Sequence, residues 1–418
     1  MRSIMNLQND EVSAAMPTDL KYQNRIKVLE VFQSGEELTA GDVSSVTGIS
    51  KLTVMKAIQF FCSKGILVSV GRGQSTEVGG KKPEFFAFSN NQYLLSITMW
   101  PSNMNFTLST VTASRIAHVE YIYELPDSVK KAFGFIKEKA YSFLKDNHIS
   151  TSQLYGINLS TAGTVDYSTN HLRYSSLSPH WGNDIPVSDY MRDIFGEKPV
   201  IFIENAGKTT GRALLDNTEL INKRVLVLFT TWGVSACFIT RGHILSGKDS
   251  LIGEIGHMII DSGDKEVCGC GSRGCFERLI DIRRIWRMID KNPPSKASLL
   301  YGKTTEEISL LNLFDASSSG DEYARELVAY LAKHFATALR NISLAFNPDI
   351  VIFQGDYAHA DRYFDETLKR YISSFQYYPA TGAFKTIYDD RNLFDLDAQG
   401  GAYILKKLYF EDTDLYLD

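Results

Sequence analysis

Three of the chain's five cysteines lie within eight residues, in the stretch CGCGSRGCFE that runs from Cys268 to Glu277. The Cys-x-Cys spacing puts two thiolates on one turn, and the glycines between them let the backbone fold tightly around an ion. Upstream, the segment LIGEIGHMIID supplies a histidine that we place on a preceding strand. Three thiolates and one imidazole are the ligand set of a closed tetrahedral zinc site. The sequence therefore predicts a structural Zn²⁺ held by His257, Cys268, Cys270 and Cys275.

Disulfide bonds are the alternative interpretation of these clustered thiols. An odd number of cysteines argues against them, and so does the reducing cytoplasm in which we place the protein. The first sixteen residues lack the apolar core of a signal peptide, and no run of eighteen apolar residues follows. We therefore expect a soluble, cytoplasmic protein without membrane contacts.

The charge of the chain is unevenly distributed. The net charge of the whole chain is −5, which by itself argues against nucleic acid as a partner. Between residues 43 and 82, however, six basic residues face one acidic residue, Glu77. This segment carries +5 and the rest of the chain −10. A local basic patch of this kind suits the phosphates of nucleic acid.

The same basic segment has the pattern of a helix-turn-helix. Residues 21–64 read as three helices, of which the second starts after an N-cap at Thr39 and the third at Ser50. Gly48 makes the tight turn between them. In the third helix Val54, Ile58 and Phe61 share a core face, which leaves Leu52, Thr53, Lys56 and Gln59 pointing outward. In this motif the N-terminal part of the last helix enters the major groove of DNA.

Two short strand-like runs follow, around the loop GRGQSTEVGGKKP, and together they predict a wing. Arg72 stands between two glycines and can reach into a narrow minor groove, whereas the loop's lysines suit phosphates. The alternative is a small packing unit whose basic face is simply solvated. We predict that the DNA contacts are made by Ser50, Lys51, Thr53, Lys56, Arg72, Lys81 and Lys82.

Beyond Asn90 the sequence alternates strand-like segments with amphipathic helices, which predicts an α/β body. A chain of 418 residues is too long for one ordinary core, and two or three folding units are expected.

These features together resemble the ROK family (repressors, open reading frames, sugar kinases), and more closely its sugar-responsive transcriptional-repressor branch. The likeness covers nearly the whole chain from about Lys21. It is carried by the helix-turn-helix, the wing loop, GTVD at 163–166, EN at 204–205, GEIGH at 253–257 and CGCGSRGCFE at 268–277. It implies an N-terminal winged helix-turn-helix followed by an α/β two-lobed, actin-like sugar-kinase fold, with a structural zinc beside a sugar cleft and assembly into a homodimer or homotetramer.

The resemblance also implies a set of sugar ligands. In ROK sugar kinases the sugar is held by an Asn-Asp pair, by the Glu and His of a Glu-x-Gly-His motif, and by the Glu after the third cysteine. Carried over to this chain, these residues are Asn205, Glu254, His257 and Glu277. A histidine that binds zinc through one nitrogen can offer its other N–H to a sugar hydroxyl.

Several departures from the kinase pattern predict that the body is not an enzyme. Ala206 stands where the family has the aspartate that deprotonates the attacking hydroxyl, and a methyl group cannot accept a proton. The phosphate loop reads TTWGVSACF, the first lobe has ITMWPSN in place of Asp-x-Gly-x-Thr, and a Gly-Gly pair has become Gln354-Gly355. We therefore predict no catalytic residues.

The leading hypothesis is a sequence-specific DNA-binding regulator, most simply a repressor of carbohydrate-metabolism genes. Its partners would be a pseudo-palindromic operator and a sugar or sugar-phosphate effector. One alternative is an active sugar kinase in which Asp166 or Glu204 replaces the missing base; another is a regulator controlled by a partner protein. The expected domains are a tail (1–20), the winged helix-turn-helix (21–89), lobe 1 (90–200), and lobe 2 (201–418) with the zinc loop and a C-terminal helix that returns to lobe 1.

Overall fold

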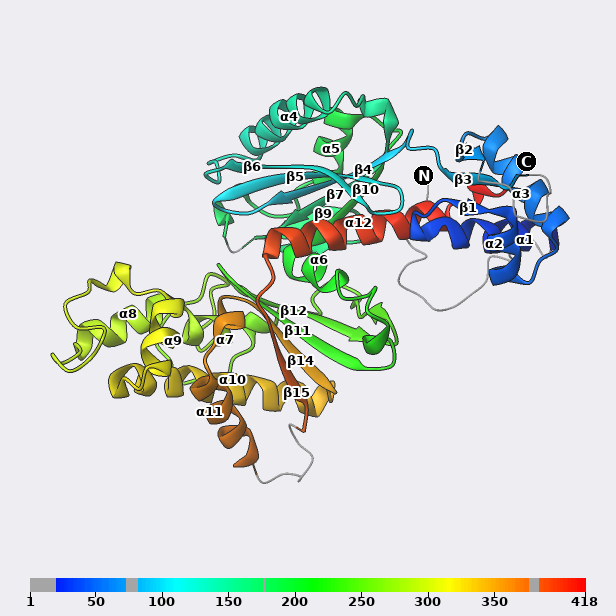
Figure 1. Cartoon of the computed structure of the whole chain (residues 1–418). Coiled ribbons are helices and arrows are strands. Elements are labelled where there is room, and N and C mark those ends of the chain that lie inside the picture. Colours follow the sequence, from blue (N-terminus) through cyan, green and yellow to red (C-terminus); the bar gives the residue numbers. More distant parts are fainter. Residues whose placement is uncertain (1–19, 73–81, 176, 376–382) are drawn as a thin grey trace.

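The computed structural model describes residues 20–72, 82–175, 177–375 and 383–418, and these form a small helical unit and two sheet-based lobes (Figure 1). The described residues form three larger sheets, with strand orders β1-β3-β2, β10-β7-β4-β5-β6 and β13-β12-β11-β14-β15, and a two-stranded sheet of β8 and β9. We call the helical unit that contains the first sheet the N-terminal unit. The bodies built on the second and third sheets are lobe 1 and lobe 2.

The N-terminal unit has the three predicted helices. Thr39 and Asp42 form a capping box at the start of the second helix, Gly48 ends it with φ +70°, and Ser50 caps the third. Val54, Ile58 and Phe61 are fully buried, as their spacing predicts. The two strand-like runs pair antiparallel, with Arg72 opposite Glu84. The elements are α1 (Leu20–Val31), β1 (Leu38–Thr39), α2 (Ala40–Thr47), α3 (Lys51–Ser63), β2 (Leu67–Arg72) and β3 (Glu84–Phe88).

Lobe 1 is a mixed sheet covered on one face by two helices. Ile97 and Leu159 from the sheet pack against Ile136 of α4 and Met191 of α5. The predicted alternation of strand and helix is confirmed here. The elements are β4 (Tyr93–Met99), β5 (Asn103–Thr110), β6 (Arg115–Ile122), α4 (Val129–Asp146), β7 (Leu154–Thr161), β8 (Thr164–Asp166), β9 (His171–Tyr174), α5 (Val187–Phe195) and β10 (Val200–Asn205).

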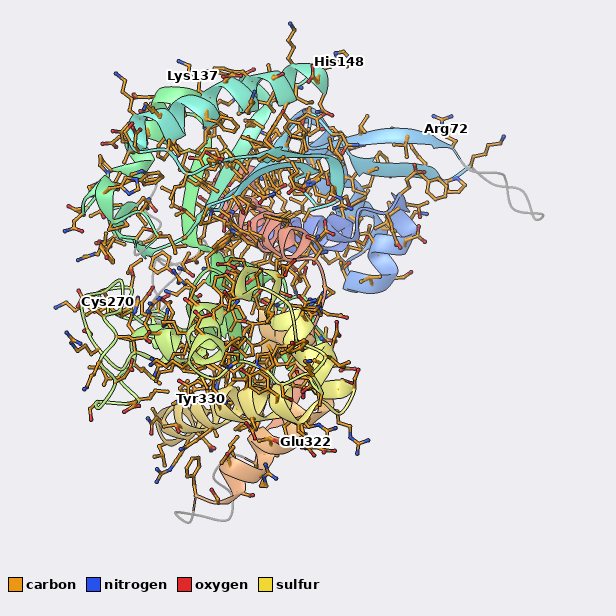
Figure 2. All side chains as sticks on the ribbon, turned by 90° about the vertical axis from the view of Figure 1, so that its left-hand side faces the viewer. Arg72, Lys137, His148, Cys270, Glu322 and Tyr330 are labelled. Carbon is orange, nitrogen blue, oxygen red and sulfur yellow. The ribbon has the colours of Figure 1, made fainter. Side chains whose placement is uncertain are left out.

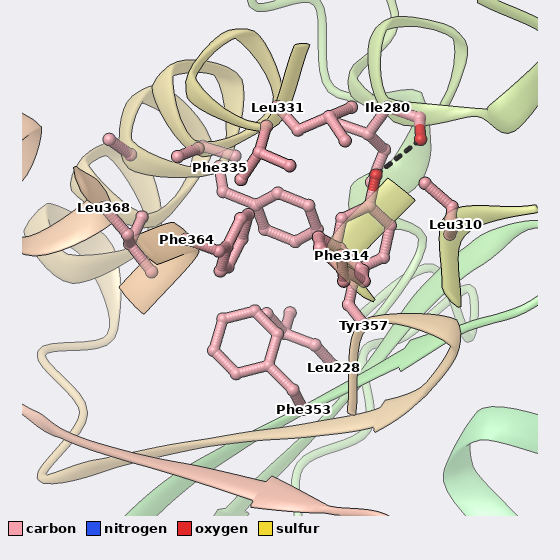
Figure 3. Close-up of a cluster of buried hydrophobic side chains, with 14 of the residues drawn as sticks. Leu228, Ile280, Leu310, Phe314, Leu331, Phe335, Phe353, Tyr357, Phe364 and Leu368 are labelled. Atoms are coloured by element: carbon pink, nitrogen blue, oxygen red, sulfur yellow. Dashed lines mark hydrogen bonds between the residues drawn. The ribbon is translucent and has the colours of Figure 1, made fainter. Parts of the chain in front are cut away.

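Lobe 2 has the larger core, which an aromatic cluster fills (Figure 3). The Phe335 ring lies 4.5 Å from that of Tyr357 and 5.5 Å from that of Phe364, and the Tyr357 hydroxyl donates to the carbonyl of Ile280 at 2.6 Å. The elements are β11 (Arg224–Thr230), β12 (Val234–Thr240), β13 (His243–Ile244), α7 (Phe276–Ile280), α8 (Ile282–Lys291), α9 (Leu310–Ser318), α10 (Glu322–Ala345), β14 (Ile350–Gly355), α11 (Arg362–Ser373) and β15 (Lys385–Asp389).

Two helices cross where the lobes meet, α6 (Ala206–Arg212) and α12 (Leu393–Glu411). At Gly400 of α12 an added Cβ would lie 1.8 Å from the carbonyl oxygen of Thr209, so only glycine permits this close approach. Beyond the crossing, Leu405 packs with Leu94 and Phe202 on the sheet of lobe 1. The helix thus runs from between the lobes to the N-terminal unit (Figure 1).

The last residues of the chain complete the core of the N-terminal unit. The Tyr416 side chain is 2% exposed and lies edge-on to the rings of Tyr22 and Phe61. The Arg25 guanidinium donates to the Tyr416 carbonyl and to the Asp418 carboxylate, both at 2.6 Å. The N-terminal unit is therefore attached to the lobes at β3–β4 and again through the C-terminal segment.

Candidate functional site

The predicted metal ligands come together. The ligand atoms of His257, Cys268, Cys270 and Cys275 all lie within 4.8 Å of one another. The Nδ1 atom of His257 is 3.6 Å from Sγ of Cys268, and Sγ of Cys270 is 3.6 Å from Sγ of Cys275. A tetrahedral ion with Zn–S bonds of about 2.3 Å separates its sulfur ligands by roughly 3.8 Å, so this set fits zinc.

The backbone around this set needs its glycines. At Gly274, with φ +73°, an added Cβ would lie 1.9 Å from the carbonyl oxygen of Asp261. His257 does not lie on a strand, as expected from sequence, but is the last residue of the 3-10 turn Ile255–His257. The turn places Nδ1 beside the thiol of Cys268, and the same residue lines the neighbouring pocket.

That pocket gathers the predicted sugar ligands. Asn205, Glu254, His257 and Glu277 all line one pocket. They come from distant parts of the chain: the end of β10, the 3-10 turn, and the start of α7.

Hydrogen bonds fix two of these side chains. Asn205 caps α6, since its Oδ1 accepts from the N–H of Gly207 at 2.9 Å, and its Nδ2 donates to the carbonyl of Gly163 at 2.9 Å. Glu277 accepts from the N–H of Val234 at 2.9 Å through Oε2. Burial raises the pKa of Glu277 above its usual range.

The pocket also has an apolar wall, which sequence reasoning missed. Trp100, Ala206 and Phe229 pack together on it, and Phe394 of α12 backs them. The Trp100 ring centroid lies 5.8 Å from that of Phe229 and 4.4 Å from that of Phe394. The only sequence signal for this wall is Ala206 itself, in the position where the kinases have an aspartate.

Neither carboxylate considered as a replacement base lines the pocket. Glu204 is fully buried and accepts from Arg212 at 2.7 Å and from the hydroxyl of Tyr167. Asp166 accepts from Arg173 at 3.0 Å and from the hydroxyl of Ser168. Both carboxylates are therefore held in ion pairs with arginine side chains.

The outward face of α3 is a second candidate site. Lys51, Leu52, Lys56 and Gln59 are exposed, and Thr53 is half-buried. The Ser50 hydroxyl lies 2.9 Å from that of Thr53 and accepts from the N–H of Thr53, so these two predicted contacts also cap the helix.

The described ends of the predicted wing are solvent-exposed. Arg72 and Lys82 are exposed, and Arg72 lies near the end of the β2–β3 hairpin, which extends away from the lobes (Figure 2). The predicted contact Lys81 lies outside the described residues.

Within the part of the chain that the structure describes, no helix combines the length and the apolarity that crossing a bilayer requires.

Comparisons with known proteins agree with this architecture. The model of the ROK family matches residues 107–407. The xylose repressor of Bacillus spizizenii is 22% identical over 371 residues, which cover 87% of this chain and 90% of the repressor. The DNA-binding transcriptional dual regulator NagC of Escherichia coli is 20% identical over 357 residues, 82% of each chain. The glucokinase of Thermotoga maritima is 26% identical, but over only 49% of this chain and 64% of the kinase.

Solved structures show the same fold. A ROK family transcriptional regulator, described as a homologue of the E. coli MLC protein, superposes with a TM-score of 0.74 at 17% identity and covers 95% of this chain and 98% of its own. The ROK hexokinase of Thermus thermophilus superposes with a TM-score of 0.59 at 19% identity over 77% of this chain and 100% of its own. With the family model matching well over half of its residues, this chain belongs to the ROK family.

Proposed function

We propose that this protein is a sequence-specific DNA-binding transcriptional repressor of carbohydrate-metabolism genes, whose ROK body senses a sugar without phosphorylating it. The observation that carries the proposal is the joining, in one chain, of an exposed basic helix-turn-helix face to a sugar-type pocket without a catalytic base. Relatives that match four fifths or more of the chain include proteins named xylose repressor and transcriptional dual regulator, which supports the same conclusion.

In this proposal the N-terminal unit is a winged helix-turn-helix that spans residues 21–89. The N-terminal half of α3 enters the major groove, where Lys56 faces base edges and Lys51 lies near the backbone. The capping pair Ser50 and Thr53 places the positive end of the helix toward phosphate. Arg72, Lys81 and Lys82 of the wing complete the set of contacts.

The ROK body, lobe 1 at 90–200 and lobe 2 at 201–418, serves sensing and assembly. Ala206 offers no group to accept the proton of an attacking hydroxyl, and the two carboxylates considered as replacements, Glu204 and Asp166, are held in ion pairs outside the pocket lining. Zn²⁺, held by His257 and the three cysteines, would have a structural role: it would fix the loop that carries Glu277.

Helix α12 is suited to connect the pocket to the DNA-binding unit. Its first turn contacts the pocket wall through Phe394, and the segment that follows it places Tyr416 inside the N-terminal unit. An effector that favours one arrangement of the lobes would move this helix and change the spacing of two DNA-binding units in a homodimer or homotetramer.

The test is fluorescence anisotropy of the full chain with a duplex from its own upstream region, with and without a panel of sugars. We expect specific binding that one sugar weakens. Lys56→Ala should weaken binding by about 5- to 150-fold, the equivalent of about 1–3 kcal/mol. Lys137→Ala, an exposed lysine on lobe 1 (Figure 2), is the matched control and should change nothing. Equal affinity for the upstream and scrambled duplexes would rule out the proposal.

A further inference from the structure

A second pocket lies beside α12, and it shares no lining residue with the pocket of Glu254 and Glu277. We call it the α12 pocket. Lobe 1 contributes Phe202 of β10, and lobe 2 contributes β13 with its neighbours on either side. The tight turn before β13 has positive φ at both Arg241 (+50°) and Gly242 (+73°), the geometry of a two-residue hairpin turn. The α12 pocket is therefore a site of its own, with walls from both lobes and from the helix.

Donor groups without protein partners surround the α12 pocket. The side chains of His243, Ser246 and Tyr403 have no hydrogen-bond partner among the described residues. Among the same residues, the ammonium group of Lys407, one turn beyond Tyr403 on α12, makes only a long contact, 3.8 Å from Oε1 of Glu411. Polar groups of this kind bond to water until a ligand replaces it. Four groups that can donate favour a ligand that accepts.

A fifth donor, Arg212, is held in place by its ion pair. Its Nε and Nη2 atoms both donate to Oε2 of Glu204, at 3.2 and 2.7 Å, whereas Nη1 has no partner among the described residues. The guanidinium carbon also lies 5.2 Å from the ring centroid of Phe202. A guanidinium fixed along one edge and on one face keeps its remaining N–H groups in a constant position, which suits recognition of an anion.

The charges around the α12 pocket favour a monoanion. Its described lining contains Arg212 and Lys407 but no carboxylate, in contrast to the sugar-type pocket. Three carboxylates lie just outside the lining: Glu204 offsets Arg212, Glu411 lies near Lys407, and Asp216 is exposed. A single negative charge can be balanced here, but the second charge of a phosphate ester would meet these carboxylates without a further cation. A carboxylate is therefore the group that fits.

The other walls of the α12 pocket are apolar. Leu215 and Ile244 belong to the hydrophobic cluster under the sheet of lobe 2, and Phe202 and Ile404 belong to the cluster between α12 and the sheet of lobe 1. A bare inorganic ion would leave these side chains facing water. A ligand with a small hydrocarbon body would cover them and gain the free energy of burying apolar surface.

From these contacts we infer that the α12 pocket binds a small organic monocarboxylate, whose carboxylate group accepts from Arg212, Lys407 and His243. The site is additional to the sugar pocket of the proposed function, and binding at it does not depend on that function. Because Lys407 lies on α12 and His243 on β13, a bound carboxylate holds this helix against lobe 2. The same helix leads to Tyr416 in the N-terminal unit, so the ligand is placed to influence that unit.

The experiment is isothermal titration of the full chain, without DNA or sugar, with butyrate, hexanoate, benzoate and phenylacetate. The amide of each acid has nearly the same shape without the charge, and phenyl phosphate tests a dianion. We expect one acid to bind about tenfold or more tightly than its amide and more tightly than phenyl phosphate. A panel in which no acid binds, in which amides bind as well as acids, or in which phenyl phosphate binds most tightly would overturn the inference.

Substitutions test the position of the bound acid. Lys407→Gln keeps a polar side chain of similar length but removes its charge, and should weaken binding of that acid about fivefold or more. His243→Gln makes the corresponding test on β13 and should also weaken it. Lys406→Gln, the same change one residue earlier on α12 and outside the lining, is the matched control and should leave the affinity unchanged. Arg212 is kept, because its loss would leave Glu204 buried without a counter-charge.

Melting temperatures of the three variants verify folding. Unchanged affinity in either pocket variant, or an equal loss in Lys406→Gln, would overturn the assignment to the α12 pocket. The proposed function fails or stands by a different measurement, anisotropy with the operator duplex. Loss of specific DNA binding with intact carboxylate binding would remove the proposed function alone.

Discussion

At the scale of single residues, Asp397 links the stability of the protein to pH. It is fully buried on α12, and the hydroxyls of Thr98 and Ser160 donate to it. Burial raises its pKa to about 7. Between about pH 4 and 7 only the folded chain keeps this proton, so the free energy of unfolding falls as the pH rises through that window.

Asp397→Asn should remove this dependence. The neutral amide loses no proton, so the variant should gain stability relative to the wild type from pH 4.5 to 7.5, by up to about 4 kcal/mol. Urea denaturation of both proteins at several pH values measures the difference. If the free energy of unfolding changes with pH in the same way in both proteins, the pKa of Asp397 is the same in the folded and the unfolded chain, and the prediction is wrong.

Also at this scale, Cys275→Ser should abolish the metal site. Cys275 precedes α7, so loss of its thiolate should release both the ion and the constraint on Glu277. We expect metal analysis to fall from one Zn²⁺ per chain to none, and sugar affinity to fall at least tenfold. Cys237→Ala, which removes a buried thiol outside the cluster, should keep its zinc. One tightly held Zn²⁺ in Cys275→Ser would argue against the predicted ligand set.

At the scale of elements, the C-terminal segment stabilises the N-terminal unit, which the proposed function assigns to DNA binding. Tyr416 fills its core between α1 and α3. Tyr416→Ala should lower the free energy of unfolding of this unit by about 3 kcal/mol and weaken DNA binding, while sugar affinity stays unchanged. Leu417→Ala, at a side chain 44% exposed, is the control. Thermal unfolding and the two binding assays report each effect, and unaltered DNA binding in Tyr416→Ala would show that the contact is dispensable.

An element could be predicted from the sequence where the residues that fix it lie close together in the chain. The starts of α2 and α3 were predictable because caps at Thr39 and Ser50 act within three residues. The ligand cluster was predictable because its residue types are rare and close in sequence. The ion pair of Arg25 with Asp418 joins residues 393 positions apart, and no local pattern indicates it. The wall of Trp100, Phe229 and Phe394 likewise depends on packing between lobes, which side-chain types alone do not encode.

At the scale of the whole molecule, the two lobes followed from the alternation of strands and helices together with the family motifs. Their relative placement follows from features that only the structure shows: the glycine crossing of α12 over α6, and the second attachment of the N-terminal unit. Because one helix touches both the pocket wall and the segment that anchors the DNA-binding unit, the two sites are physically continuous. This continuity permits coupling between the pocket and the DNA-binding unit. The strength of that coupling is measured as a free energy.

Coupling between the sites must be reciprocal. If the effector lowers operator affinity by some factor, the operator must lower effector affinity by the same factor, since both report one coupling free energy. We expect a factor of 5 to 150, the equivalent of 1–3 kcal/mol. Calorimetric titration of the sugar into the protein with and without a saturating operator duplex measures it, and a scrambled duplex serves as the control. Sugar affinity that is indifferent to the operator would mean that the pocket and the DNA-binding unit are energetically independent, and that the contacts of α12 serve stability alone.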